Sequence, residues 1–81
     1  MYKTISAKVE HGVDALVRVT NTLRRKEFQI RGLVMSEGEI AGYSDLMIII
    51  EEVSNLGIEQ AMMHLRKIIN VHEIKEFKEG D

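Results

Sequence analysis

The sequence of 81 residues contains no cysteine, no proline and no tryptophan, and its only aromatic residues are two tyrosines and two phenylalanines. Without cysteine, disulfides, thiolate nucleophiles and thiolate-bound metals are excluded. Without proline or any low-complexity stretch, nothing indicates an interdomain linker. Hydrophobic residues make up 44% of the chain and charged residues 30%, which is ordinary for a globular protein and too apolar for disorder. We therefore expect a single domain over residues 1–81.

The chain also lacks the features of a nucleic-acid-binding or membrane protein. Its net charge of −2 gives no general attraction for nucleic acid or for an anionic membrane. The N-terminal residues alternate in hydropathy, unlike a signal peptide. The longest apolar run, Leu46–Ile50, is far shorter than the ~20 residues of a membrane span. We expect a cytoplasmic protein that binds neither nucleic acid nor membrane.

Hydrophobic periodicity predicts three elements in the first half of the chain. Residues 2–10 alternate between apolar and polar side chains, which is typical of a strand with one buried face. From Val13 to Lys26 the apolar residues recur at helical spacing, and cations gather in the last turn. Phe28–Met35 is a second strand whose apolar phase slips near Gly32. The slip predicts either a β-bulge or two buried faces.

The second half repeats this pattern. Residues 44–52 contain consecutive apolar side chains, which favours a central strand or one covered on both faces. Val53–Asn55 offers a cap for an amphipathic helix over residues 58–69. Residues 71–77 form a fourth strand, and residues 78–81 a polar tail.

The order of elements predicts an α+β fold of the ferredoxin-like βαββαβ type, a four-stranded antiparallel sheet with two helices on one face. The other face of the sheet is then bare. We expect the surplus apolar side chains of Leu33, Met35, Met47 and Ile49 to lie on that bare face. A partner subunit is the natural cover for such a surface.

No pattern of catalytic or metal-binding residues is present. The histidines, His11, His64 and His72, have no metal-ligand spacing. The sequence has no catalytic-triad order, phosphate loop or dinucleotide fingerprint. We therefore assign no catalytic residues and no metal site, and expect that the protein is not an enzyme.

The segment with the most chemical promise is the turn His11–Asp14. A strand that runs into a helix N-terminus presents unpaired backbone N–H groups, which suit a small anion such as an amino-acid carboxylate. The alternative is an ordinary turn in which Asp14 caps the helix. We favour the cap and keep the ligand site as the second interpretation.

In the helix after this turn and in later segments, the chain resembles the ACT domain family, and within it the small regulatory subunits of acetolactate synthase. Ala15–Val19 matches the family's Ala/Val-Leu-x-Arg-Val helix start, and Arg25–Leu33 matches its Arg-rich helix end and following strand. Ile58–Gln60 and Leu65–Val71 are similar to the second helix, with less specificity.

The resemblance implies a non-catalytic subunit that binds and activates the large subunit of acetolactate synthase in branched-chain amino-acid biosynthesis. No cofactor is expected in this chain; thiamine diphosphate, Mg²⁺ and FAD belong to the catalytic partner. A homodimer through edge strands is implied, with an amino-acid effector at the seam between subunits. The alternatives are a stand-alone ACT-type amino-acid sensor of another pathway and a ferredoxin-like dimer without a ligand.

The site residues follow from these arguments. The effector-binding candidates are His11, Gly12, Val13, Asp14 and Gln29. The candidates for the dimer or partner interface are Gln29, Arg31, Leu33, Met35, Met47 and Ile49.

The chain departs from the family pattern where the ligand would lie. His11, Asp14 and Gln29 stand where the family has Asn, Gly and Asn. Asp14 would add bulk and place a carboxylate opposite that of the ligand, so we predict weak or absent valine binding. Many small subunits carry a second domain, for which 81 residues leave no room, so we expect a minimal single-domain form.

Overall fold

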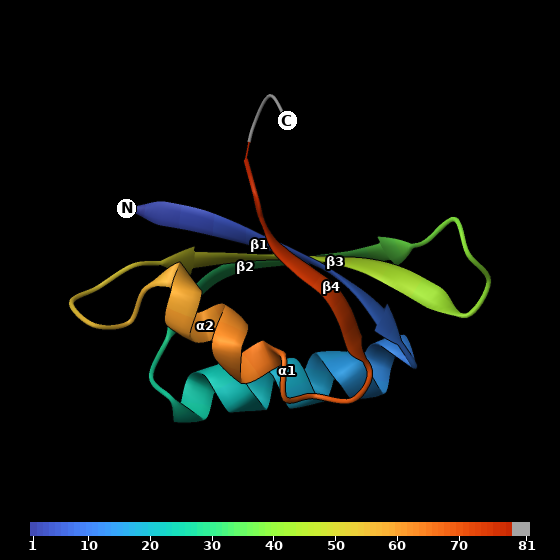
Figure 1. The fold of residues 1–81 in the computed structure, drawn as a ribbon, viewed down its shortest axis with the longest axis horizontal. Coiled ribbons are helices and arrows are strands. Elements are labelled where there is room, and N and C mark those ends of the chain that lie inside the picture. Colours follow the sequence, from blue (N-terminus) through green and yellow to red (C-terminus); the bar gives the residue numbers. More distant parts are fainter. Residues whose placement is uncertain (79–81) are drawn as a thin grey trace.

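The computed structural model describes residues 1–78, in which two helices cover one face of a four-stranded sheet (Figure 1). The elements are β1 (Tyr2–Glu10), α1 (Gly12–Arg25), β2 (Gln29–Glu37), β3 (Tyr43–Glu51), α2 (Ile58–Leu65) and β4 (Val71–Phe77). This is the predicted ferredoxin-like fold, which is confirmed. Most of the predicted polar tail, residues 79–81, lies outside the described residues. Neither helix is long and apolar enough to cross a membrane, within the part of the chain that is described.

The sheet is antiparallel throughout, with the strand order β2-β3-β1-β4. β3 therefore lies between two neighbours, as its run of consecutive apolar residues predicted. Its side chains alternate between the two faces: Leu46, Ile48 and Ile50 are buried under the helices, whereas Met47 and Ile49 are half-buried on the open face. β2 and β4 are the edge strands, and within residues 1–78 each has a neighbouring strand on one side only.

A β-bulge in β2 explains the slip in its apolar phase. The pairing of β2 with β3 runs Ile30 to Ile50 and then Gly32 to Ile49, so Arg31 is an extra residue. After such an insertion the alternation of side chains is shifted by one residue, so residues of the other parity now point to a given face of the sheet. Ile30 and Leu33 consequently both lie on the helix-covered face, although their positions in the sequence differ in parity.

The bulge also corrects one expectation. Leu33 pairs with Ile48, and Met35 pairs with Leu46, so both side chains of β2 lie on the helix-covered face. Met35 packs against the core, while Leu33, at the rim, is 38% exposed. The prediction that Leu33 and Met35 share the bare face with Met47 and Ile49 was wrong, because it did not include the inserted residue.

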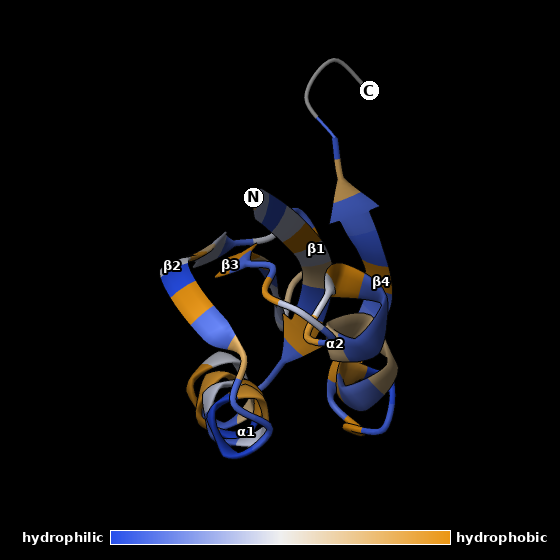
Figure 2. Cartoon of the chain, turned by 90° about the vertical axis from the view of Figure 1, so that its left-hand side faces the viewer, coloured by the Kyte–Doolittle hydropathy of each residue, from blue (hydrophilic) through white to orange (hydrophobic). Residues whose placement is uncertain are grey.

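The core lies between the sheet and the helices, and no polar side chain is buried within residues 1–78. α1 contributes Ala15, Val19 and Leu23, which recur every four residues on one side of the helix. Figure 2 shows both helices on the same side of the sheet, α1 near β2 and α2 near β4. Each large aliphatic side chain buried here contributes about 1.5–3 kcal/mol of hydrophobic stabilisation.

α2 is shorter than its apolar pattern suggests. It ends at Leu65, and residues 66–70 form turns with bonds such as Ile68 N–H to the Leu65 carbonyl at 3.0 Å. The chain must reverse here because Val71 pairs with Val9 of β1. As a result Ile68 is half-buried and Ile69 is 82% exposed, although both belong to the apolar pattern of the helix predicted over residues 58–69.

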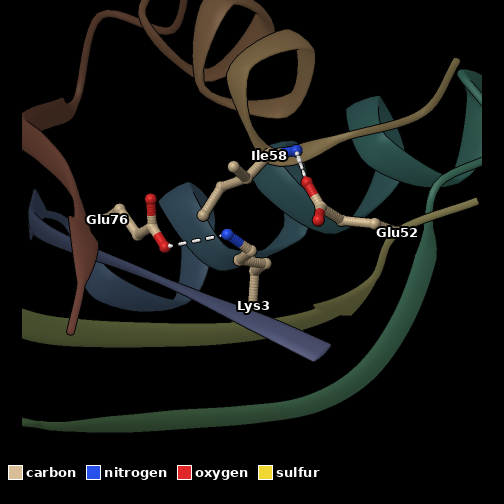
Figure 3. A network of polar contacts seen from close by, with 4 residues as sticks. All are labelled: Lys3, Glu52, Ile58 and Glu76. Atoms are coloured by element: carbon tan, nitrogen blue, oxygen red, sulfur yellow. Dashed lines mark hydrogen bonds and ion pairs between the residues drawn. The ribbon is translucent and has the colours of Figure 1, made fainter. Parts of the chain in front are cut away.

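The N-terminus of α2 is capped by an unexpected residue. The predicted cap at Val53–Asn55 was wrong: Val53 bridges to Leu56, and the helix starts only after Gly57. Instead, the carboxylate of Glu52, six residues before the helix, accepts a hydrogen bond from the Ile58 N–H at 2.9 Å (Figure 3). A negative charge at this end also interacts favourably with the helix dipole. Figure 3 also shows an ion pair between Lys3 and Glu76, which joins β1 to β4 at 3.5 Å.

We predict that Glu52→Ala lowers the free energy of unfolding by about 1 kcal/mol, because a helix N–H loses both its acceptor and a favourable charge. Glu52→Gln keeps an acceptor and should lose about half as much. Urea denaturation followed by circular dichroism measures both. Glu59→Ala is the control, because Glu59 is an exposed residue of the same first turn. A loss in Glu59→Ala equal to that in Glu52→Ala would contradict the assigned hydrogen bond.

Candidate functional site

The turn between β1 and α1 is built on an unusual backbone conformation. His11 has φ 52° and ψ 60°, in the left-handed region that residues other than glycine seldom adopt. Its carbonyl accepts the first helical bond, from the Ala15 N–H at 2.9 Å. The left-handed residue lets the strand enter the helix without a connecting loop. The His11 side chain is exposed to solvent.

Asp14 does not cap α1. Among residues 1–78, no side chain makes a capping hydrogen bond to this helix, and Asp14 lies exposed in the first turn. Our preferred interpretation, a helix-capping Asp14, was therefore wrong. The carboxylate contributes through its charge, about 0.3–1 kcal/mol at a helix N-terminus. The N–H groups of the first turn have no intrahelical partner either.

Gly12 packs the turn against the sheet where β2 ends and β3 begins. A Cβ at this position would lie 3.3 Å from Met35 Sδ and 3.3 Å from Ser44 Oγ. The turn is thus seated between the end of β2 and the beginning of β3. Val13, in contrast, is 70% exposed. The structure brings His11, Gly12, Val13 and Asp14 together as one segment beside Met35.

Gln29, the remaining effector candidate, lies at the opposite end of the sheet. It pairs with Glu51, whereas Glu37, at the other end of β2, pairs with Ser44 near the turn. Eight residue steps along a strand correspond to about 26 Å. A single chain therefore does not bring Gln29 to the β1–α1 turn.

The open face of the sheet carries an apolar stripe. Met47 and Ile49 lie there as predicted, and the register adds Val34 opposite Met47 and Phe77 opposite Thr4. Val34 is 57% exposed and Phe77 is 46% exposed. We name Val34, Met47, Ile49 and Phe77 the open-face stripe. Sequence reasoning missed Val34, whose face is set by the bulge, and Phe77, which is the last residue of its strand.

Ion pairs border the open-face stripe. Lys8 Nζ lies 3.0 Å from Asp45 Oδ1, and Arg31 Nε lies 2.8 Å from Glu51 Oε1. The hydrogen bond to the Asp45 carboxylate, together with its negative charge, raises the pKa of Lys8 above its usual value. Gln29 and Arg31 are both exposed at the start of β2. The charged groups of this face are thus largely matched within the chain.

The other histidines have packing and pairing partners. His72 Nε2 lies 2.6 Å from Glu10 Oε1, and its ring meets Tyr43 edge-on with a centroid distance of 6.1 Å. His64 meets Phe28 in the same manner at 5.9 Å. Within residues 1–78, no three side chains of the metal-ligating types gather closely enough to hold an ion.

The fold is similar to several solved structures. The acetolactate synthase small subunit from Thermotoga maritima superposes with a TM-score of 0.85 at 23% identity, over 98% of this chain and 48% of that one. This chain thus spans about half the length of the Thermotoga subunit. The crystal structure of the ACT domain from GTP pyrophosphokinase of Chlorobium tepidum gives a TM-score of 0.75 at 17% identity, over 95% of this chain and 97% of that domain. The solution structure of the same domain gives 0.74.

Sequence comparison identifies the family. No curated protein matches the sequence significantly. A family model described as the ACT domain, however, matches residues 11–74, from the β1–α1 turn to the middle of β4. That span contains both helices, the strands β2 and β3, and most of the candidate site. By this match, together with its fold, the chain belongs to the ACT domain family.

Proposed function

We propose that the protein is a non-catalytic regulatory subunit of acetolactate synthase, which binds and activates the large catalytic subunit in branched-chain amino-acid biosynthesis. The observation that carries the proposal is the match to the Thermotoga small subunit over 98% of this chain. The Ala15–Val19 motif, in the helix that follows the candidate turn, supports it. Thiamine diphosphate, Mg²⁺ and FAD would be bound by the large subunit.

A second candidate is a stand-alone ACT-type amino-acid sensor of another pathway. The observation in its favour is the match to the GTP pyrophosphokinase ACT domain, which covers 95% of this chain and 97% of that domain. The two candidates differ in whether an acetolactate synthase large subunit responds to the protein.

A homodimer through the free edge of β2 would complete the candidate site. Leu33 is the middle residue of β2, so antiparallel pairing of two copies about this residue would bring Gln29 of the partner subunit opposite Glu37. Glu37 pairs with Ser44, which lies against Gly12 of the turn. The effector candidates that one chain keeps apart would then meet across the dimer interface.

Such a composite site would bind valine weakly or not at all. The N–H groups at the start of α1 favour a carboxylate, just as those of α2 favour Glu52. Asp14, however, places its own carboxylate in the first turn of α1. Like charges in a partly enclosed site repel each other, and the side chain fills space that glycine would leave free.

We predict that the protein raises the rate of acetolactate formation when it is added to its cognate large subunit with saturating thiamine diphosphate, Mg²⁺ and FAD. Coupling between subunits is commonly about 1–3 kcal/mol, or about 5–150-fold. The GTP pyrophosphokinase ACT domain at equal concentration is the control for a nonspecific effect of a similar fold. An unchanged rate at saturating concentrations of the protein would refute the proposed function.

We further predict that Asp14→Gly creates or strengthens valine binding, because it removes both the charge and the bulk from the turn. Asp14→Asn removes only the charge and should have a smaller effect. Isothermal titration calorimetry measures both. Asn21→Gly is the control, because it introduces the same residue, which is about 1 kcal/mol less favourable than alanine in a helix, further along α1. Micromolar valine binding by the unmodified protein would contradict our interpretation of Asp14.

A further inference from the structure

A groove with a basic rim lies between α1 and the turns after α2. Arg18, Asn21 and Arg25 line it from α1, and Lys67 and Ile69 line it from the turns at residues 66–70. All five side chains are exposed. Figure 1 shows the chain after α2 passing alongside α1 before it enters β4. We name this feature the helix groove.

The cations of the helix groove form no ion pair with an acidic side chain among residues 1–78. The ion pairs found within residues 1–78 use Lys3, Lys8, Arg31 and His72, all of them on strands. Arg25 Nε instead donates to the Asn21 carbonyl at 3.4 Å, and Arg24 Nη2 donates to the Asn21 amide oxygen at 3.2 Å. No acidic side chain lines the groove in the described part of the chain.

This surface is opposite in sign to the whole chain. Residues 18–26 and 66–67 together hold six of the 11 lysines and arginines and no acidic residue, although the chain carries a net charge of −2. Unpaired charges of one sign gathered on one surface attract a partner of the opposite sign and help to orient it. The helix groove therefore favours a negatively charged occupant.

The spacing of the groove residues favours a peptide as that occupant. Arg18 and Arg25 are seven residues apart in one helix, about 10.5 Å along its axis. A single phosphate cannot bridge them, whereas carboxylates three residues apart in a peptide of polyproline II conformation lie on the same side and are separated by about 9 Å. Ile69, which is 82% exposed, offers an apolar contact for the same segment. Nucleic acid is disfavoured, because no aromatic side chain lines the groove to stack on bases.

We propose that the helix groove is the docking site for an acidic segment of the catalytic partner. Two carboxylates would lie against Arg18 and Arg25, with Lys67 on the opposite wall and one apolar side chain on Ile69. The proposed function specifies no face of the domain. The inference rests on that function for the identity of the partner, and on the charges of the groove for the chemistry of the segment.

The test compares two double charge reversals. Arg18→Glu/Arg25→Glu reverses two charges in the groove. Lys75→Glu/Lys78→Glu is the control, because it makes the same change in charge at two exposed residues outside the groove, Lys75 in β4 and Lys78 directly after it. The probe is a fluorescein-labelled peptide with glutamate at every third position around one leucine. We expect the groove variant to bind this peptide at least about tenfold more weakly, and the control variant to bind within about twofold of wild type. Equal binding by both variants would overturn the proposal.

Two further measurements keep the result specific. Arg18→Gln/Arg25→Gln removes the charges without reversing them, so it should weaken peptide binding by about half as much on a logarithmic scale. Circular dichroism shows whether each variant is folded. Inorganic tripolyphosphate is the competitor that distinguishes the kinds of anion. If tripolyphosphate binds at least as tightly as the peptide, the groove is a small-anion site and the proposal is overturned.

The stimulation of the large subunit separates this inference from the proposed function. The concentration for half-maximal stimulation should rise at least about tenfold for Arg18→Glu/Arg25→Glu and stay within about twofold for Lys75→Glu/Lys78→Glu. Stimulation by the groove variant equal to wild type would overturn the docking site and leave the proposed function standing. If no form of the protein stimulates the large subunit, the proposed function fails, and the assignment of the partner fails with it.

Discussion

The extra residue in β2 determines which surface each neighbouring side chain occupies. Because Arg31 is inserted in the pairing with β3, Leu33 and Met35 lie on the helix-covered face and Val34 on the open face. Met35 can then pack against Gly12, which seats the β1–α1 turn at the end of the sheet. Without the insertion, Leu33 and Met35 would lie on the open face, and the turn would lose this support. Both the turn and the open-face stripe thus depend on one bulge.

The two helices begin in chemically different ways, although each follows a strand of the same sheet. At α2, Glu52 supplies a carboxylate to the Ile58 N–H from within the chain. At α1, the first turn has no side-chain cap among residues 1–78, and Asp14 contributes only charge. One helix N-terminus is therefore satisfied internally, whereas the other remains available to solvent or to a ligand. This difference makes the β1–α1 turn the stronger candidate for an effector site.

The sequence was sufficient to predict the fold because each strand and helix has its own hydrophobic period. The alternation in residues 2–10 and the apolar run in Leu46–Ile50 predicted β1 and the central β3 correctly. The errors arose where a distant contact decides the outcome. Ile69 follows the helical period, yet α2 ends early because Val71 must reach Val9. Glu52 caps a helix that starts six residues later, which no local capping pattern describes. The roles of the site residues stay predictions, since they depend on a second chain.

The distribution of charge divides the domain into surfaces suited to different partners. On the sheet, Lys8 and Arg31 are paired within the chain, which leaves an apolar stripe and the free backbone of β2 as the features available for association. On the helices, Arg18 and Arg25 pair with no carboxylate in the described part of the chain, which favours association governed by charge. A copy of the chain paired at the β2 edge would bind the backbone of that strand, whereas the groove lies between α1 and the turns after α2. The proposed dimer and the proposed docking of an acidic partner would therefore use different surfaces of one small domain, and a subunit that couples effector binding to a catalytic partner needs both.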